Sequence, residues 1–179
     1  MSGKSPWKKI SSRTVYDNDW ITVKDQKVIT PAGTVGVYGK VSFKNIAVGI
    51  IPIDDAKNIW LVGQHRYTLD EYSWEIPEGG CPAEEEPLDA AKRELKEETG
   101  LVAEKWKCIM RLHTSNSVTD EEAFIFTAEN LTQEESQPED TEDLKVQKLP
   151  LREAVEMIKR SEITDAISVA GILRVAMTE

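Results

Sequence analysis

Alternating apolar and polar positions dominate the first third of the chain. Residues 20–30 and 34–43 are rich in β-branched and aromatic side chains and flank a Pro-Ala-Gly turn, which predicts a β-hairpin. Residues 15–16 have a similar β-like composition. Residues 46–53 are continuously apolar, which predicts a buried strand, and residues 59–64 follow a polar turn and are expected to pair back on it.

Helical spacing replaces this alternation between Pro87 and Gly100. Residues 88–99 are strong helix formers, Pro87 suits the first helical turn, and Gly100 stands where a helix-ending glycine belongs. Leu88, Ala91 and Leu95 recur at helical spacing, so we expect them to form the buried stripe of this helix.

The remaining third predicts strands followed by helices. Residues 104–112 and 123–128 are strand-like and are joined by a polar loop, and residues 129–143 form an acidic stretch expected to be an exposed connection. Residues 149–160 and 163–177 have helical spacing. Mixed strands with segregated helices indicate an α/β or α+β layered fold.

Composition narrows the function classes. The chain has 179 residues, enough for one domain with a sizeable core, and a formal net charge of −10. This charge argues against nucleic acid or an anionic membrane as the main partner. Two cysteines without metal-ligand spacing favour a reducing cytoplasm, and no apolar run approaches the length of a membrane span.

The predicted helix 88–99 carries a cluster of like charges. Glu94 and Glu98 stack on one face, and Glu97 lies beside them. One interpretation is a solvated acidic surface. The other is a site for a hard cation, because clustered carboxylates at a turn–helix junction suit Mg²⁺ or Mn²⁺.

The register of the surrounding residues favours the cation site. The stretch GGCPAEEEPLDAAKRELKEETGL, residues 79–101, resembles a complete Nudix box, G-x5-E-x7-R-E-U-x-E-E-x-G-U with U aliphatic. Its specified Gly, Glu and Arg positions match by chance on the order of 10⁻⁹ per starting point. The resemblance implies a divalent-metal-dependent hydrolase of nucleoside diphosphate derivatives on an α/β/α sandwich, here of mixed sheet with an N-terminal β-hairpin subdomain.

The resemblance implies roles for the box residues. Glu94 and Glu98 correspond to the principal metal ligands. Glu97 either shares that role or supports the ligands without binding the metal itself. The backbone carbonyl of Glu78, just before the first box glycine, matches a position that often supplies a further oxygen. The expected cofactor is Mg²⁺, with Mn²⁺ as a substitute. Arg93 is expected to orient the acids through an ion pair to Glu85 or Glu97.

Segments outside the box resemble the ADP-ribose and nucleoside diphosphate sugar pyrophosphatase branch of the family. WEIPEGG at 74–80 is similar to its E-x-P-x-G lead-in, and LVGQHRYTL at 61–69 is similar to a strand ending in Q-x-R. This implies substrate-binding roles for Gln64 and Arg66. A guanidinium bridges two phosphate oxygens well.

The loop at 113–128 resembles S-P-G-x-x-x-E followed by a strand. Glu121 then corresponds to the carboxylate that orients or deprotonates the attacking water. Asn116 and Ser117 replace the usual Pro-Gly, which leaves Asp120 and Glu122 as alternative bases.

The N-terminal segments NDWITV and PAGTVGVY resemble a β-segment that related enzymes exchange between two subunits. Trp20 and Tyr38 occupy the positions of aromatics that stack on the purine, and ordinary core packing is the alternative for both. The resemblance implies a homodimer, with residues 1–44 as the dimerisation and base-binding subdomain and residues 45–179 as the hydrolase domain.

The expected reaction is Mg²⁺-dependent hydrolysis of the diphosphate of ADP-ribose or a nucleoside diphosphate sugar to a nucleoside monophosphate and a sugar phosphate. Two alternatives stand beside it. One is another Nudix pyrophosphatase activity, on dinucleoside polyphosphates or in cleansing of the nucleotide pool. The other is a non-catalytic nucleotide sensor, which the intact acids of the box disfavour.

Overall fold

The structure, a computed structural model, describes residues 4–134 and 144–178. The chain forms two compact units. The first contains Met1–Asn45 together with His113–Glu121, and the second contains Ile46–Leu112 together with Glu122–Glu179. Over the described residues, every helix falls short of the length and apolar character needed to cross a membrane.

The first unit is built on a three-stranded antiparallel sheet. Its strands are β1 (Lys8–Asp17), β2 (Ile21–Ile29) and β3 (Val35–Phe43), in the order β1-β2-β3. The hairpin of β2 and β3 is the one that the sequence predicts. β1 extends well beyond residues 15–16, the part that the sequence indicates. Its register with β2 shifts at two bulges, and the strict alternation of side chains that marks a strand is lost there.

The loop from His113 to Glu121 belongs to this unit and continues its sheet. Val41 of β3 donates to the carbonyl of Val118 at 2.9 Å and accepts from the N–H of Asp120 at 3.2 Å. Phe43 N–H donates to the Asp120 carboxylate at 3.1 Å. The loop is therefore held along the edge of β3 by backbone and side-chain bonds.

The second unit contains two sheets. The four-stranded sheet has the order β7-β4-β9-β8, with β4 parallel to β9 and antiparallel to β7, and the three-stranded antiparallel sheet has the order β10-β5-β6. Their strands are β4 (Ile46–Pro52), β5 (Asn58–Arg66), β6 (Glu71–Glu75), β7 (Glu78–Cys81), β8 (Leu101–His113), β9 (Glu122–Gln133) and β10 (Lys145–Pro150).

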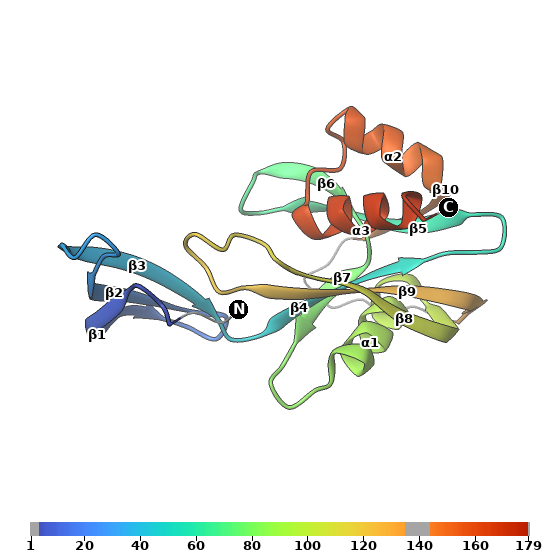
Figure 1. The fold of residues 1–179 in the computed structure, drawn as a ribbon. Helices are drawn as coiled ribbons and strands as arrows, with labels where there is room; N and C mark the ends of the chain where they lie inside the picture. The colour runs from blue at the N-terminus through green and yellow to red at the C-terminus, as the bar shows by residue number, and fades with distance from the viewer. Residues whose placement is uncertain (1–3, 135–143, 179) are drawn as a thin grey trace. The chain divides into compact units, whose positions relative to one another are not determined.

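Helices cover both faces of the four-stranded sheet. α1 (Pro87–Thr99) lies on one face, and α3 (Ala166–Ala176), with α2 (Leu151–Lys159) beside it, lies on the other (Figure 1). The pleat of β4 explains both contacts: Val48 and Ile50 pack with α1, whereas Ile51 packs with the apolar side of α3. The result is the α/β/α sandwich of mixed sheet that the sequence implies.

Several boundaries differ from the sequence-based expectation: β8 begins at Leu101 rather than 104, and the helix expected from 163 begins at Ala166. β9 continues to Gln133, so the exposed connection does not begin at 129, and residues 135–143 of that connection lie outside the described residues. The helix expected from 149 begins at Leu151, because residues 145–150 pair with β5 as the strand β10. This strand is largely exposed and polar, and it therefore lacks an apolar signature in the sequence.

Candidate active site

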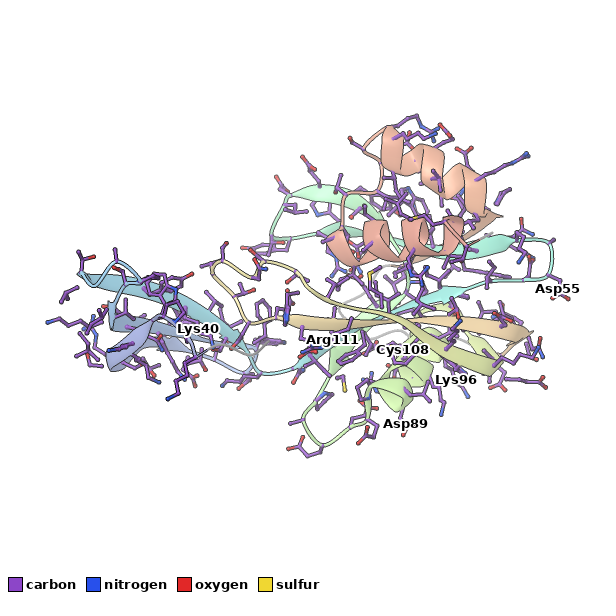
Figure 2. The ribbon with its side chains drawn as sticks, in the orientation of Figure 1. Lys40, Asp55, Asp89, Lys96, Cys108 and Arg111 are labelled. Carbon is purple, nitrogen blue, oxygen red and sulfur yellow. The ribbon has the colours of Figure 1, made fainter. Side chains whose placement is uncertain are left out.

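The glutamates that resemble the Nudix ligands lie on α1, a helix whose first and last residues are well defined. Pro87 begins the helix, and Gly100 ends it with a positive φ of 69° while its N–H donates to the Lys96 carbonyl at 2.8 Å. Figure 2 labels Asp89 and Lys96 towards the two ends of this helix. The buried face of the helix is wider than the stripe that the sequence predicts, because it also contains Glu98. These buried positions are Ala90, Ala91, Leu95, Glu98 and Thr99.

Arg93 organises the carboxylates of this helix. Its guanidinium donates to Glu85 at 3.0 Å, to Glu94 at 2.8 Å and to Glu97 at 2.9 Å, and it also donates to the Gly80 carbonyl at 2.9 Å. The hydrogen bonds to Glu85 lead the effects that raise the pKa of Arg93 above its ordinary value. The sequence predicts an ion pair to Glu85 or Glu97; the structure contains both, and Glu94 is a third partner.

The two predicted principal ligands both lie against the backbone at the start of β7, Glu98 at the N–H of Glu78 and Glu94 at Gly79. The Glu98 carboxylate accepts from the N–H of Glu78 at 3.0 Å. A Cβ at Gly79 would come within 2.1 Å of the Glu94 carboxylate carbon, so only glycine leaves room for that side chain. This close approach explains the glycine at position 79, the second residue of β7.

Arg66 forms a second cluster of charges, at the end of β5. Its Nε donates to Glu75 at 2.9 Å, a further N–H of the guanidinium donates to the same carboxylate, and Nη2 donates to Glu78 at 3.2 Å. The hydrogen bonds to Glu75 lead the effects that raise the pKa of Arg66. The Glu75 side chain is only 4% exposed, so this carboxylate is almost fully withdrawn from solvent.

Glu78 links the two clusters. Its side chain faces Arg66, and its backbone N–H faces Glu98. Burial raises the pKa of the Glu78 carboxyl well above its usual range, and the negative charges of Asp165 and Glu75 raise it further, while Arg66 opposes them. Among the described residues, its Oε2 atom is buried without a hydrogen-bond partner.

Gln64, the other substrate-binding residue that the resemblance implies in this unit, lies near the end of β5. It pairs in register with Ser73 of β6 and is half-buried. It stands two residues before Arg66, so both side chains lie on the same face of the strand. The second unit therefore brings together the box glutamates, Glu78 and Arg66, with Gln64 on the strand that carries the arginine.

The candidate bases differ in their partners. Asp120 is bound by Lys40 and by the N–H of Phe43. Burial raises its pKa, but these bonds outweigh that effect and lower it. Glu122 is paired with Arg111. Glu121 accepts from the Thr114 hydroxyl, which carries no charge.

The structure keeps the two predicted stacking aromatics apart within one chain. Tyr38 pairs in register with Gln26 of β2. Trp20 comes just before the first residue of β2, and its carbonyl accepts from the N–H of Lys44 at 2.9 Å. Six residues along a strand span about 20 Å. Tyr38 contacts Trp7 edge-to-face, with ring centroids 5.4 Å apart, and Trp20 is 69% exposed.

The chain was compared with known proteins. A NUDIX domain matches residues 43–169, and a nucleoside diphosphate sugar hydrolase N-terminal domain matches residues 7–41. The chain belongs to the Nudix family.

Two relatives agree with this membership, and a solved structure agrees with the fold. The chain is 34% identical to an ADP-ribose pyrophosphatase of Mycobacterium tuberculosis, over 93% of this chain and 81% of the relative. It is 32% identical to an ADP-ribose pyrophosphatase of Bacillus subtilis, over 96% and 94%. The crystal structure of an ADP compounds hydrolase superposes with a TM-score of 0.87 at 22% identity, covering 99% of this chain and 96% of that one. The expected family and fold are thereby confirmed.

Sequence reasoning missed three residues of this Nudix site. Glu75 binds Arg66, Asp165 acts electrostatically on Glu78, and Ser168 accepts from the N–H of Ile76. Glu75 stands in the E-x-P lead-in, a signal that was available. Asp165 and Ser168 come from α3, about ninety residues further on, and only folding brings them to the site.

Proposed function

We propose that this Nudix chain hydrolyses the diphosphate of ADP-ribose or of a nucleoside diphosphate sugar, giving a nucleoside monophosphate and a sugar phosphate. The observation that carries the proposal is the position of Glu78. Its side chain holds Arg66, and its N–H holds Glu98 of the acidic helix. A group suited to phosphate binding and a group suited to cation binding are therefore joined through one residue. The two ADP-ribose pyrophosphatases, similar over most of the chain, support the substrate class.

The carboxylates around Gly79 fit a hard divalent cation, which we propose to be Mg²⁺, with Mn²⁺ as a substitute. Glu94, Glu98 and the carbonyl of Glu78 would hold it, with Glu97 in support, and Arg93 keeps their oxygens in place. When bound, the cation supplies charge neutralisation for the diphosphate. Within residues 4–134 and 144–178, no three acid, histidine or cysteine side chains are already grouped as a complete metal site. The predicted set includes a backbone oxygen, and Arg93 holds two of its carboxylates.

Arg66 is proposed to bind the diphosphate, and Gln64 to bind substrate beside it. Arg66 is 36% exposed although its partner Glu75 is buried, so part of the arginine side chain is accessible from solvent. Glu75 occupies one edge of the planar group and fixes its orientation. A preorganised guanidinium recognises phosphate oxygens at a smaller entropic cost than a freely rotating one.

Glu121 is proposed as the base that orients the attacking water. Its neighbours are the weaker candidates, because Asp120 is bound by Lys40 and Glu122 by Arg111. Glu121→Gln should lower kcat about 10²-fold with little change in KM. Asp120→Asn and Glu122→Gln serve as matched variants, and a larger loss of kcat in either one would assign the base to that residue.

A homodimer sharing its N-terminal strands is proposed from the surface of the first unit. Eight large apolar side chains between residues 7 and 43 are at least 38% exposed, an unusual concentration for a monomer. They are Trp7, Ile10, Val15, Tyr16, Trp20, Val35, Val37 and Phe43. Because Trp20 and Tyr38 lie about 20 Å apart in one chain, stacking of both on one base requires two copies. A monomeric mass in solution at micromolar concentration would contradict the dimer.

We retain the division into residues 1–44 as the dimerisation and base-binding subdomain and residues 45–179 as the hydrolase domain. A cytoplasmic location is proposed from the two cysteines, Cys81 and Cys108, which are both free thiols. The net charge of −10 supports a small nucleotide, rather than nucleic acid or an anionic membrane, as the partner.

The deciding experiment is product identification in ¹⁸O-labelled water across a panel of nucleotides, with and without Mg²⁺. The panel contains ADP-ribose, nucleoside diphosphate sugars, dinucleoside polyphosphates and nucleoside triphosphates. We expect turnover of the first two classes and label in one of the two monophosphate products. Turnover confined to the last two classes would refute the proposed substrate.

A further inference from the structure

A buried serine of α3 is hydrogen-bonded to the backbone beside the proposed site. Ser168 is fully buried, and its Oγ accepts from the N–H of Ile76 at 2.9 Å. Its own N–H donates to Asp165, the N-cap of α3, at 2.7 Å. Serine in a helix usually faces solvent or bonds to its own helix. Here Asp165 binds the backbone N–H of Ser168, and the Ser168 hydroxyl accepts a hydrogen bond from Ile76, which is distant in the sequence.

Ile76 lies where the chain passes from one sheet of the second unit to the other. The ladder of β5 with β6 ends at Glu75, and the ladder of β4 with β7 begins at Glu78. We name residues 75–78 the crossover segment. Its two central residues are held by bonds of another kind: Ile50 donates to the Pro77 carbonyl at 2.8 Å, and Ile76 donates to Ser168.

The ends of the crossover segment carry the charges of the site. Glu75 binds Arg66 at one end, and Glu78 binds Arg66 and Glu98 at the other. Four residues therefore set the distance between the guanidinium and the acidic helix. A shift of the segment would change the positions of Arg66 and of the Glu78 backbone together.

Packing leaves little freedom for such a shift while the serine bond is present. The side chain of Ile76 is fully buried, and a Cβ on Gly49 would lie 2.9 Å from Ile76 and 2.6 Å from Ile167 of α3. The first turn of α3 thus contacts the crossover segment through Ser168 and the strand beside it through Ile167. The hydrogen bond adds a direction to a contact that is otherwise apolar.

We propose that Ser168 is a positioning residue for the diphosphate hydrolysis, acting through the N–H of Ile76 on the crossover segment. This inference rests on the proposed function, and it adds a role for α3 in that reaction. Asp165 contributes by fixing the helix turn that presents Ser168.

The test compares Ser168→Ala with Ile172→Val, a truncation at another fully buried position of α3 that removes no hydrogen bond. Ser168→Ala should lower kcat about tenfold and raise the Mg²⁺ concentration for half-maximal rate several-fold, because small misplacements of reacting groups are costly. Ile172→Val should leave both values within about twofold of wild type, by the same geometric reasoning. Ser168→Thr keeps the hydroxyl and should therefore retain most of the wild-type kcat.

Amide hydrogen exchange at Ile76, followed by NMR without nucleotide or metal, reports on the contact independently of turnover. We expect exchange at least about tenfold faster in Ser168→Ala than in Ile172→Val, since the N–H loses its acceptor. If the wild-type chain is active but Ser168→Ala and Ile172→Val have equal kcat and equal Mg²⁺ requirement, the positioning role is overturned and the proposed function is not. A wild-type chain that hydrolyses none of the proposed substrates would overturn the function, and the role of Ser168 in it, whatever the exchange rates.

Discussion

Arg93 and Arg66 form two clusters of charge in the same unit, and their similarities are only superficial. Both arginine side chains are 36% exposed, and both bind more than one carboxylate. The carboxylate partners of Arg93 lie within eight residues of it. The partners of Arg66 lie on a neighbouring strand and on the crossover segment, and they are more deeply buried than most partners of Arg93.

This difference assigns different tasks to the two arginines. Arg93 binds three carboxylates that are 13–32% exposed, so it holds the acids of the helix in an arrangement that a cation can use. Arg66 has one edge occupied by Glu75 and also donates to Glu78, and 36% of its side chain remains exposed. We therefore expect Arg93 to govern the metal requirement and Arg66 to govern substrate affinity.

The largest effect is expected where the two clusters meet. Glu98→Gln removes the charge of the carboxylate that binds Glu78, and we expect kcat to fall about 10²- to 10³-fold. Glu156→Gln is the matched control, because Glu156 is a helical glutamate paired with Lys159 on α2. Near-normal turnover of Glu98→Gln at saturating Mg²⁺ would remove Glu98 from the metal site.

Arg93→Lys tests the metal side of the comparison. A lysine cannot bind Glu85, Glu94 and Glu97 at once, so the Mg²⁺ concentration for half-maximal rate should rise about 10- to 100-fold, while KM for the nucleotide changes little. Arg160→Lys, at a surface arginine that also binds two carboxylates, provides the control. An altered nucleotide KM with an unchanged Mg²⁺ requirement would reverse our assignment.

Arg66→Lys tests the substrate side. We expect KM for ADP-ribose to rise about tenfold, because the planar group that bridges phosphate oxygens is lost, and the Mg²⁺ requirement to stay close to that of wild type. Steady-state kinetics at several Mg²⁺ concentrations separate the two effects. Equal responses of both parameters in Arg66→Lys and Arg93→Lys would show that the two clusters act as one.

The smallest effect is expected at Asp54, a carboxylate that supports the fold away from both arginines, in the turn where Figure 2 labels its neighbour Asp55. Burial raises the pKa of Asp54, but hydrogen bonds from Asn58 and Lys148 outweigh it and lower the pKa from 3.8 to about 2. A lowered pKa stabilises the folded state above pH 3.8, and this contribution is lost as the pH falls towards 2.

Asp54→Asn should therefore cost about 1–2 kcal/mol of unfolding free energy at pH 7 and clearly less near pH 2. Denaturant unfolding of both proteins at the two pH values measures this difference. The kcat of Asp54→Asn at pH 7 should equal that of wild type. A stability difference that is independent of pH would show that the charge of Asp54 is not what stabilises the turn.

How much the sequence could predict depended on how far apart the interacting residues stand. The pairs of Arg93 with Glu85 and Glu97 follow from helical spacing and a short loop, and the helix itself follows from Pro87, its apolar stripe and Gly100. The layered fold followed from the family resemblance together with strand and helix periodicity. β1 and β10 were under-predicted because both are exposed strands without a clean apolar pattern.

The sequence by itself determined the acidic helix and its glycines, because those residues interact with near neighbours along the chain. Tertiary structure alone decided that Glu75 orients Arg66, that Glu78 joins the arginine to the helix, and that Ser168 holds the segment between them. Glu75 stands only nine positions from Arg66, but the register of β5 with β6 decides which of their side chains meet. For Ser168, the physical reason is that a buried hydrogen bond between residues 92 positions apart leaves no periodic trace in either segment. Its partners are selected by the packing of α3 against the sheet, which exists only in the folded chain.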